Sequence, residues 1–173
     1  MIGFPQKVQY IYLKSDRHFN SMNKRTYSPL KLENNYLHKS LENLEKSVWP
    51  ALSPDEGSYL IKTCHSLRKK QLKDFSIEDL RIMIGQNIGL KYLVPLAINV
   101  LQQNILAEGD NYEGDLLKSV LTSELTYWKE NKDNWLKVCN LVDLNTNLLK
   151  ETDTTFEIRK GWFDSYKDFK GVW

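Results

Sequence analysis

Apolar residues recur at helical spacing along most of the chain after residue 37, and this pattern predicts a mainly α-helical fold. Leu41, Leu44 and Val48 fall at positions i, i+3 and i+7, which places them on one stripe of a helix. Residues 90–106 form the most apolar segment, and we expect them to build the central core helix. Because Pro95 falls in its first turns, this helix is predicted to start near residues 92–94 or to kink there. The periodic segments together indicate a compact bundle of six or seven helices.

Residues typical of helix N-termini mark where several of these helices begin. Ser53 precedes Pro54 and two acidic residues, a strong start signal. Ser76 is followed at the third helical position by Asp79, and a further helix is predicted to start at Asp115 or Gly114. Further helical segments are predicted at residues 123–132, 133–149 and 155–169. The start signals and the apolar periodicity therefore support the same helical organisation.

The N-terminal residues follow a different pattern. Residues 8–13 are rich in β-branched and aromatic side chains and predict a short strand. The rest of residues 1–36 is polar and basic without a period, and Met22 offers an internal start. We therefore expect a basic, weakly structured extension over residues 1–36, with one short strand or hairpin, followed by a helical domain over residues 37–173.

Charge is divided unevenly between these two parts. The whole chain has 24 basic and 22 acidic residues, but residues 1–40 hold seven basic and two acidic side chains, a net charge of +5. Residues 41–173 hold 17 basic and 20 acidic side chains, a net charge of −3. This division argues against a protein that binds nucleic acid over its whole surface. Aromatic residues are interleaved with the cations of the basic N-terminal segment, as in proteins that bind single-stranded nucleic acid. A small nucleic-acid-binding regulator is therefore the alternative function.

Residues 108–115, here called the acidic loop, carry the densest charge of the helical domain. The loop contains four carboxylates, no basic residue and one tyrosine, in a context rich in turn-forming residues. An acidic segment with an aromatic residue among its charges is a candidate protein-binding surface. The candidate residues are Glu108, Asp110, Tyr112, Glu113 and Asp115.

No set of residues points to catalysis, a metal or a cofactor. The three histidines, His18, His38 and His65, are not spaced as metal ligands, and no glycine-rich phosphate-binding motif occurs. Cys64 and Cys139 lie far apart and are expected to be buried, reduced thiols. We therefore expect a protein that is not an enzyme and needs no cofactor.

The chain also lacks the features of an exported or membrane protein. No stretch approaches the roughly 18 uninterrupted apolar residues of a membrane span, and the first residues lack the apolar core of a secretory signal. A cytoplasmic location is therefore expected. The basic run of residues 68–70, together with Lys73, is predicted to lie at a solvated helix end, with phosphate contact as the less favoured interpretation.

Several phrases in the middle of the chain are distinctive. They are LENLE at 41–45, CHSLRKKQLKDFSIEDLRIMIGQNIGLKYLVPLA at 64–97, NILAEGD at 104–110 and YEGDLL at 112–117. In this order they resemble the CdiI-type immunity proteins of bacterial contact-dependent growth inhibition (CDI) systems. The resemblance covers about residues 40–140 and leaves out residues 1–36.

The resemblance implies a binding function. It implies that the chain binds the C-terminal toxin domain of its cognate CDI system, often a nuclease, and blocks the active site or the substrate path. The acidic loop could then fill a basic substrate cleft. An alternative contact region is residues 122–173, which match the family poorly, with Trp128, Trp135 and Trp162 as its aromatic anchors.

Overall fold

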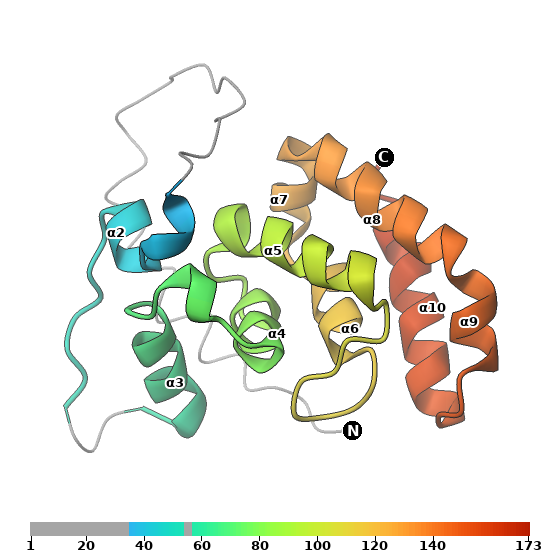
Figure 1. Cartoon of the computed structure of the whole chain (residues 1–173), viewed down its shortest axis with the longest axis horizontal. Helices are drawn as coiled ribbons and strands as arrows, with labels where there is room; N and C mark the ends of the chain where they lie inside the picture. Colours follow the sequence, from blue (N-terminus) through green and yellow to red (C-terminus); the bar gives the residue numbers. More distant parts are fainter. Residues whose placement is uncertain (1–34, 54–56) are drawn as a thin grey trace.

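The computed structural model describes residues 35–53 and 57–173, which form an assembly of α-helices (Figure 1). The helices are α2 (Leu41–Glu45), α3 (Tyr59–Leu67), α4 (Ile77–Gly85), α5 (Leu90–Gln103), α6 (Asp115–Leu121), α7 (Leu125–Glu130), α8 (Lys132–Leu144), α9 (Thr146–Glu151) and α10 (Phe156–Lys170), with 3₁₀ turns η2 (Tyr36–His38) and η3 (Leu72–Asp74). Within these two ranges there is no β-strand, and an isolated antiparallel bridge pairs Ser40 with Gln71. The mainly α-helical prediction is confirmed. The strand predicted at residues 8–13 lies outside the described residues, as does the basic extension up to residue 34.

The prediction that Ser76 begins a helix is confirmed. The Asp79 N–H donates to Ser76 Oγ at 3.2 Å, and the Ser76 N–H donates to Asp79 Oδ2 at 2.8 Å. This reciprocal pair is a capping box, which satisfies two amides that the start of a helix would leave unpaired. Helix α6 likewise starts at Asp115, one of the two predicted positions.

Two helix starts differ from the prediction. Helix α3 is capped by Ser58, whose Oγ accepts the Ile61 N–H at 3.4 Å, and not by Ser53. Helix α5 begins at Leu90 and contains Pro95, so the predicted start near residues 92–94 is wrong, whereas the alternative of a helix that runs through this point stands. Gly89 precedes Leu90 with φ of 66°, so a left-handed residue ends the preceding turn and lets the next helix begin at once.

The segment 123–149, interpreted as two helical stretches, forms the three helices α7, α8 and α9. Asparagines stand at both breaks. The Nδ2 groups of Asn131 and Asn145 donate at 2.8 Å to the carbonyls of Tyr127 and Leu141, each four residues earlier. Asparagine side chains that bond nearby backbone groups offer an alternative to continued helix, so the chain turns at these points.

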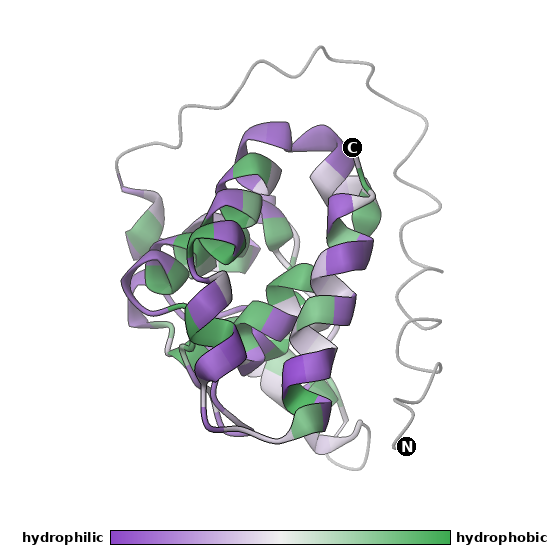
Figure 2. Cartoon of the chain, turned by 90° about the vertical axis from the view of Figure 1, so that its right-hand side faces the viewer, coloured by the Kyte–Doolittle hydropathy of each residue, from purple (hydrophilic) through white to green (hydrophobic). Residues whose placement is uncertain are grey.

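Helices α4, α5 and α6 form the centre of the described structure. Helix α4 packs on α5 and α6, α6 also packs on α10, and α5 packs on α8. In Figure 1, α2 and α3 lie on one side of this centre and α8, α9 and α10 on the other. Met83, Leu93 and Leu117 are fully buried in the core, and the helices visible in Figure 2 carry both hydrophobic and hydrophilic residues. The acidic loop leads into α6 and lies beside α4.

Candidate partner-binding surface

The acidic loop is anchored by the apolar residues that precede it. Ile105 and Ala107 are buried, and the side chain of Asn104 accepts the Leu106 N–H at 3.0 Å. The Gly114 N–H donates to the Leu106 carbonyl at 3.0 Å, which brings the two ends of the loop together. The loop therefore leaves and re-enters the body of the protein at one place.

Side chains hold the middle of the loop. The amides of Gly109 and Asn111 donate to the two carboxylate oxygens of Asp115, Oδ1 at 2.7 Å and Oδ2 at 3.1 Å. The amide between them, that of Asp110, donates to Glu78 Oε2 at 2.9 Å. Three consecutive amides thus donate to carboxylates of α4 and α6, which gives partners to backbone groups that no helix or sheet would satisfy.

Arg81 joins these two carboxylates. Its Nε and Nη2 donate to the two oxygens of Glu78, both at 2.6 Å, and its Nε lies 3.6 Å from Asp115 Oδ2. The Arg81 hydrogen bond lowers the pKa of Glu78 below its ordinary value, and Glu78 in turn raises the pKa of Arg81. We call these residues the Glu78–Arg81–Asp115 cluster. Its guanidinium offsets the charge of Asp115, whose side chain is 2% exposed.

The loop contains glycine where a side chain would collide with its surroundings. A Cβ on Gly109 would lie 2.4 Å from Glu78 Oε2 and 3.1 Å from Asp115 Oδ2. A Cβ on Gly114 would lie 2.7 Å from the ring of Trp162, and Gly114 has φ of 80°, in the left-handed region. The absence of a side chain at both positions therefore lets the loop pack closely against α4, α6 and α10.

The structure separates the five predicted residues of the acidic loop into three groups. Glu108, Asp110 and Glu113 are exposed, and their side chains form no ion pair with another described residue. Tyr112 is half-buried, and burial, followed by the nearby Asp115 charge, raises its pKa. Asp115 faces inward, so its prediction as a contact residue is not supported; its carboxylate holds the loop instead.

Of the three tryptophans predicted as anchors, two lie in the core. Trp128 and Trp162 are 0% and 1% exposed. Trp128 donates its Nε1–H to Ser123 Oγ at 2.9 Å and meets the Phe169 ring edge-to-face. These two side chains fill the interior and are unavailable for direct contact. Trp135 is half-buried and donates to the Phe169 carbonyl at 3.0 Å.

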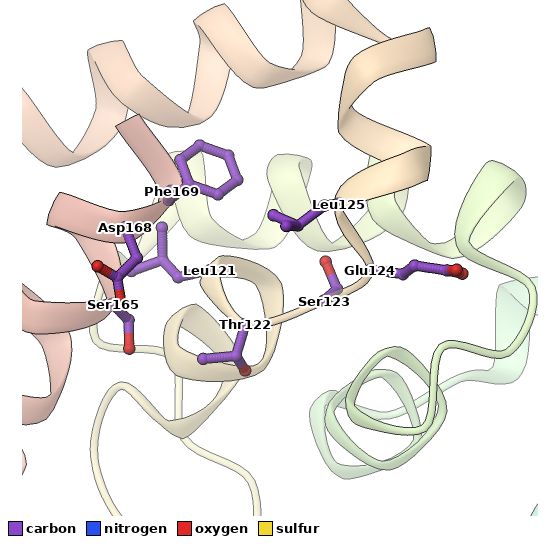
Figure 3. A pocket seen from close by; sticks show the side chains of 8 residues that line it. All are labelled: Leu121, Thr122, Ser123, Glu124, Leu125, Ser165, Asp168 and Phe169. Atoms are coloured by element: carbon purple, nitrogen blue, oxygen red, sulfur yellow. The ribbon is translucent and has the colours of Figure 1, made fainter. Parts of the chain in front are cut away.

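A second surface feature, an open hollow of about 320 Å³, lies where α6 leads into α7 beside α10. It is lined by Leu121, Thr122, Ser123, Glu124, Leu125, Ser165, Asp168 and Phe169. Figure 3 shows Leu121, Leu125 and Phe169 around it, with the carboxylates of Glu124 and Asp168 on opposite sides. Leu125 is 55% exposed. The pattern-based prediction missed this feature, because its walls come from segments far apart in the sequence.

Comparison with known families identifies the chain. The model of a family described as CDI immunity proteins matches residues 43–138, more than half of the 173 residues. The chain belongs to the CDI immunity proteins. The resemblance found in the sequence is therefore confirmed. A search of curated proteins gave no match.

The acidic loop and the hollow of this immunity protein differ in how much of each lies within the residues that match the family. Residues 43–138 include the whole acidic loop and the Glu78–Arg81–Asp115 cluster. They also include the α6–α7 side of the hollow but not α10, which supplies its opposite wall. The acidic loop is thus built entirely from the part of the chain that matches the family.

The described part of the immunity protein contains no group of three or more His, Cys, Asp or Glu residues that could hold a metal ion. Cys64 and Cys139 are buried free thiols in the core, and burial raises the pKa of Cys64 to about 11. That thiol is therefore protonated at neutral pH, which disfavours it as a nucleophile. No helix in the two described ranges is long and apolar enough to span a membrane.

The basic run after α3 departs from the predicted solvated helix end at Arg68, while Lys69 and Lys73 are exposed as predicted. Arg68 is 3% exposed, donates to Glu45 at 2.5 Å and to the Ser47 carbonyl at 2.9 Å, and stacks over the Trp49 ring. Lys70 pairs with Asp79 at 2.6 Å. Arg68 thus holds the end of α2 and the segment after it against α3, because Glu45, the Ser47 carbonyl and the Trp49 ring all contact one cation.

Proposed function

We propose that this immunity protein binds the C-terminal toxin domain of its cognate CDI system and neutralises it by covering the active site or the substrate path. Membership of the CDI immunity family is the observation that carries this proposal. Binding alone is sufficient for such an inhibitor, so no catalytic step by this chain is required. The site of action is the cytoplasm of the cell that receives the toxin.

The acidic loop is the contact surface that we propose. It presents the exposed carboxylates of Glu108, Asp110 and Glu113, with the half-buried Tyr112 beside them. A nuclease is the toxin class that fits best, because an enzyme that binds a polyanionic substrate has a positively charged cleft. Complementary charge speeds association and favours the correct partner over others.

Co-expression with the toxin domain encoded immediately upstream tests the proposed function. We expect the full chain to restore growth and to co-purify with that domain, whereas a toxin domain from an unrelated CDI system remains toxic and unbound. Failure to restore growth and to bind the linked domain would contradict the proposal.

The nucleic-acid alternative rests on the basic residues 1–40 and has its own test. If it holds, replacing Lys24, Arg25 and Lys31 by Gln in the full chain abolishes nucleic-acid binding while protection from the toxin remains. An electrophoretic mobility shift with single-stranded RNA, run beside the growth assay, separates the two functions.

A further inference from the structure

The acidic loop depends for its conformation on two carboxylates, one on α4 and one at the start of α6. The amides of Gly109, Asp110 and Asn111 donate only to the side chains of Glu78 and Asp115 among the described groups. Backbone hydrogen bonds join the two ends of the loop, but residues 109–111 between them are held by these side chains. The conformation of the loop is therefore set by α4 and α6.

The two carboxylates that hold the loop lie close to each other. Glu78 Oε2 and Asp115 Oδ2 both lie within 3.1 Å of the point that a Cβ on Gly109 would occupy. Two negative charges this close, one of them buried, repel each other unless a cation lies between them. Arg81 is the cation that contacts both, through two bonds to Glu78 and one contact to Asp115.

We infer that Arg81 is a positioning residue for partner binding: it fixes the acidic loop in one conformation before the partner arrives. This inference rests on the proposed function, because it assigns a role to the same surface. Arg81 is half-buried and points its guanidinium at Glu78 and Asp115, so it acts through the loop. A loop that is already ordered loses less conformational entropy on binding, and its affinity is correspondingly higher.

Two substitutions should disturb the contact between the Glu78–Arg81–Asp115 cluster and the loop, one in the cluster and one in the loop. Arg81→Met removes the cation and leaves the two carboxylates unshielded, while Gly109→Ala introduces a Cβ that collides with Glu78 and Asp115. Arg81→Lys keeps the charge but loses the paired geometry toward Glu78, so it should rescue only in part. Lys70→Met is the matched control, because it removes another ion pair to α4, that with Asp79, without touching the loop.

The first measurement is hydrogen exchange of the loop amides in the full chain. We expect Arg81→Met and Gly109→Ala to speed exchange at residues 109–111 by about 10-fold or more, Arg81→Lys by less, and Lys70→Met by less than about twofold. Circular dichroism confirms that each variant remains helical. Exchange at the wild-type rate in both Arg81→Met and Gly109→Ala would overturn the inference.

The second measurement is binding kinetics with the toxin domain encoded upstream. We expect Arg81→Met and Gly109→Ala each to bind the toxin domain about 10-fold more weakly than the wild type. Arg81→Lys should lose less affinity, and Lys70→Met should bind like the wild type. A faster-exchanging loop with unchanged affinity overturns the positioning role while the proposed function stands. A wild-type chain that does not bind the domain overturns the proposed function, and the positioning role falls with it.

Discussion

The acidic loop and the hollow beside α10 present opposite kinds of surface. The loop shows three exposed carboxylates on a backbone whose amides donate to Glu78 and Asp115. The hollow lies at a junction of helices and combines three apolar side chains with three hydroxyl residues, and its two carboxylates lie on opposite sides. One surface is defined by electrostatics and the other by incomplete packing.

This difference separates residues that display charge from residues that support the fold. In the loop, Glu108, Asp110 and Glu113 face solvent, while Asp115 faces inward and shares the loop amides with Glu78 of α4. At the hollow, Phe169 is 1% exposed and packs on the buried Trp128, so these two aromatic side chains stabilise the fold. The comparison therefore predicts that substitutions in the loop change binding and that substitutions behind the hollow change stability.

The largest effect is expected behind the hollow. Trp128→Ala removes a fully buried indole and its bond to Ser123, and it should lower the free energy of unfolding by about 3–5 kcal/mol. Urea denaturation followed by circular dichroism measures the loss. Trp128→Phe, which keeps a ring, should lose less and should bind the toxin domain normally when folded. A Trp128→Phe variant of wild-type stability that bound about 10-fold more weakly would break the comparison.

The next effect is on binding through the loop. Changing Glu108, Asp110 and Glu113 together to Lys should weaken toxin binding by about 100-fold, because like charges would then face a basic partner. The salt dependence of the affinity should also flatten, and the thermal midpoint should change little. The control replaces the exposed acids Glu151, Asp153 and Glu157 by Lys and makes the same change in net charge. If both triple variants lose the same affinity, the effect comes from net charge and the loop has no special role.

A smaller effect is expected on the pH dependence of the free energy of unfolding, through Glu78. The folded-state pKa of Glu78 is lowered, chiefly by the Arg81 hydrogen bond, so Glu78 stabilises the fold above its ordinary pKa of 4.5. This contribution is lost as the pH falls below 4.5 toward the lower folded value. Because the pair is partly exposed, we expect a loss of about 0.5–1 kcal/mol. Urea denaturation from pH 6 to pH 3 should show a shallower decline for Glu78→Gln. Equal declines would contradict the prediction.

The smallest effect is expected at the rim of the hollow. Leu125 is 55% exposed, so Leu125→Ala should change the free energy of unfolding by less than about 0.5 kcal/mol and the toxin affinity by less than about twofold. Denaturation and binding assays on this variant check both values. Binding weakened by about 10-fold with unchanged stability would make the hollow the contact surface and reverse the comparison.

Local signals in the sequence predicted much of the helical fold. The capping box of Ser76 and Asp79 and the start of α6 at Asp115 depend on residues within one turn, so the sequence pattern was sufficient. The start of α3 was predicted at Ser53 because Pro54 and two acidic residues follow it, yet Ser58 is the serine that caps the helix. The pattern alone did not distinguish between them.

The roles of the charged and aromatic residues were harder to predict because they depend on distant partners. Asp115 and Arg68 were both expected to face solvent, yet each is buried against residues from another segment. Trp128 and Trp162 were candidate anchors, and their burial follows from how α6, α7 and α10 pack. The acidic loop itself was found from composition, since Glu108, Asp110 and Glu113 stand close together in sequence.

The side chains of the loop differ from its backbone in how freely they can change. Gly109, Asp110 and Asn111 contribute their amides to the hydrogen bonds with Glu78 and Asp115, and every residue except proline carries such an amide. Position 109 is the exception, because a side chain there would collide with both carboxylates. Glu108, Asp110 and Glu113 can therefore be replaced over generations without altering the groups that shape the loop. With the acidic loop as the proposed contact surface, an immunity protein built this way would acquire recognition of a diverged toxin by surface substitution, while inheriting its scaffold intact.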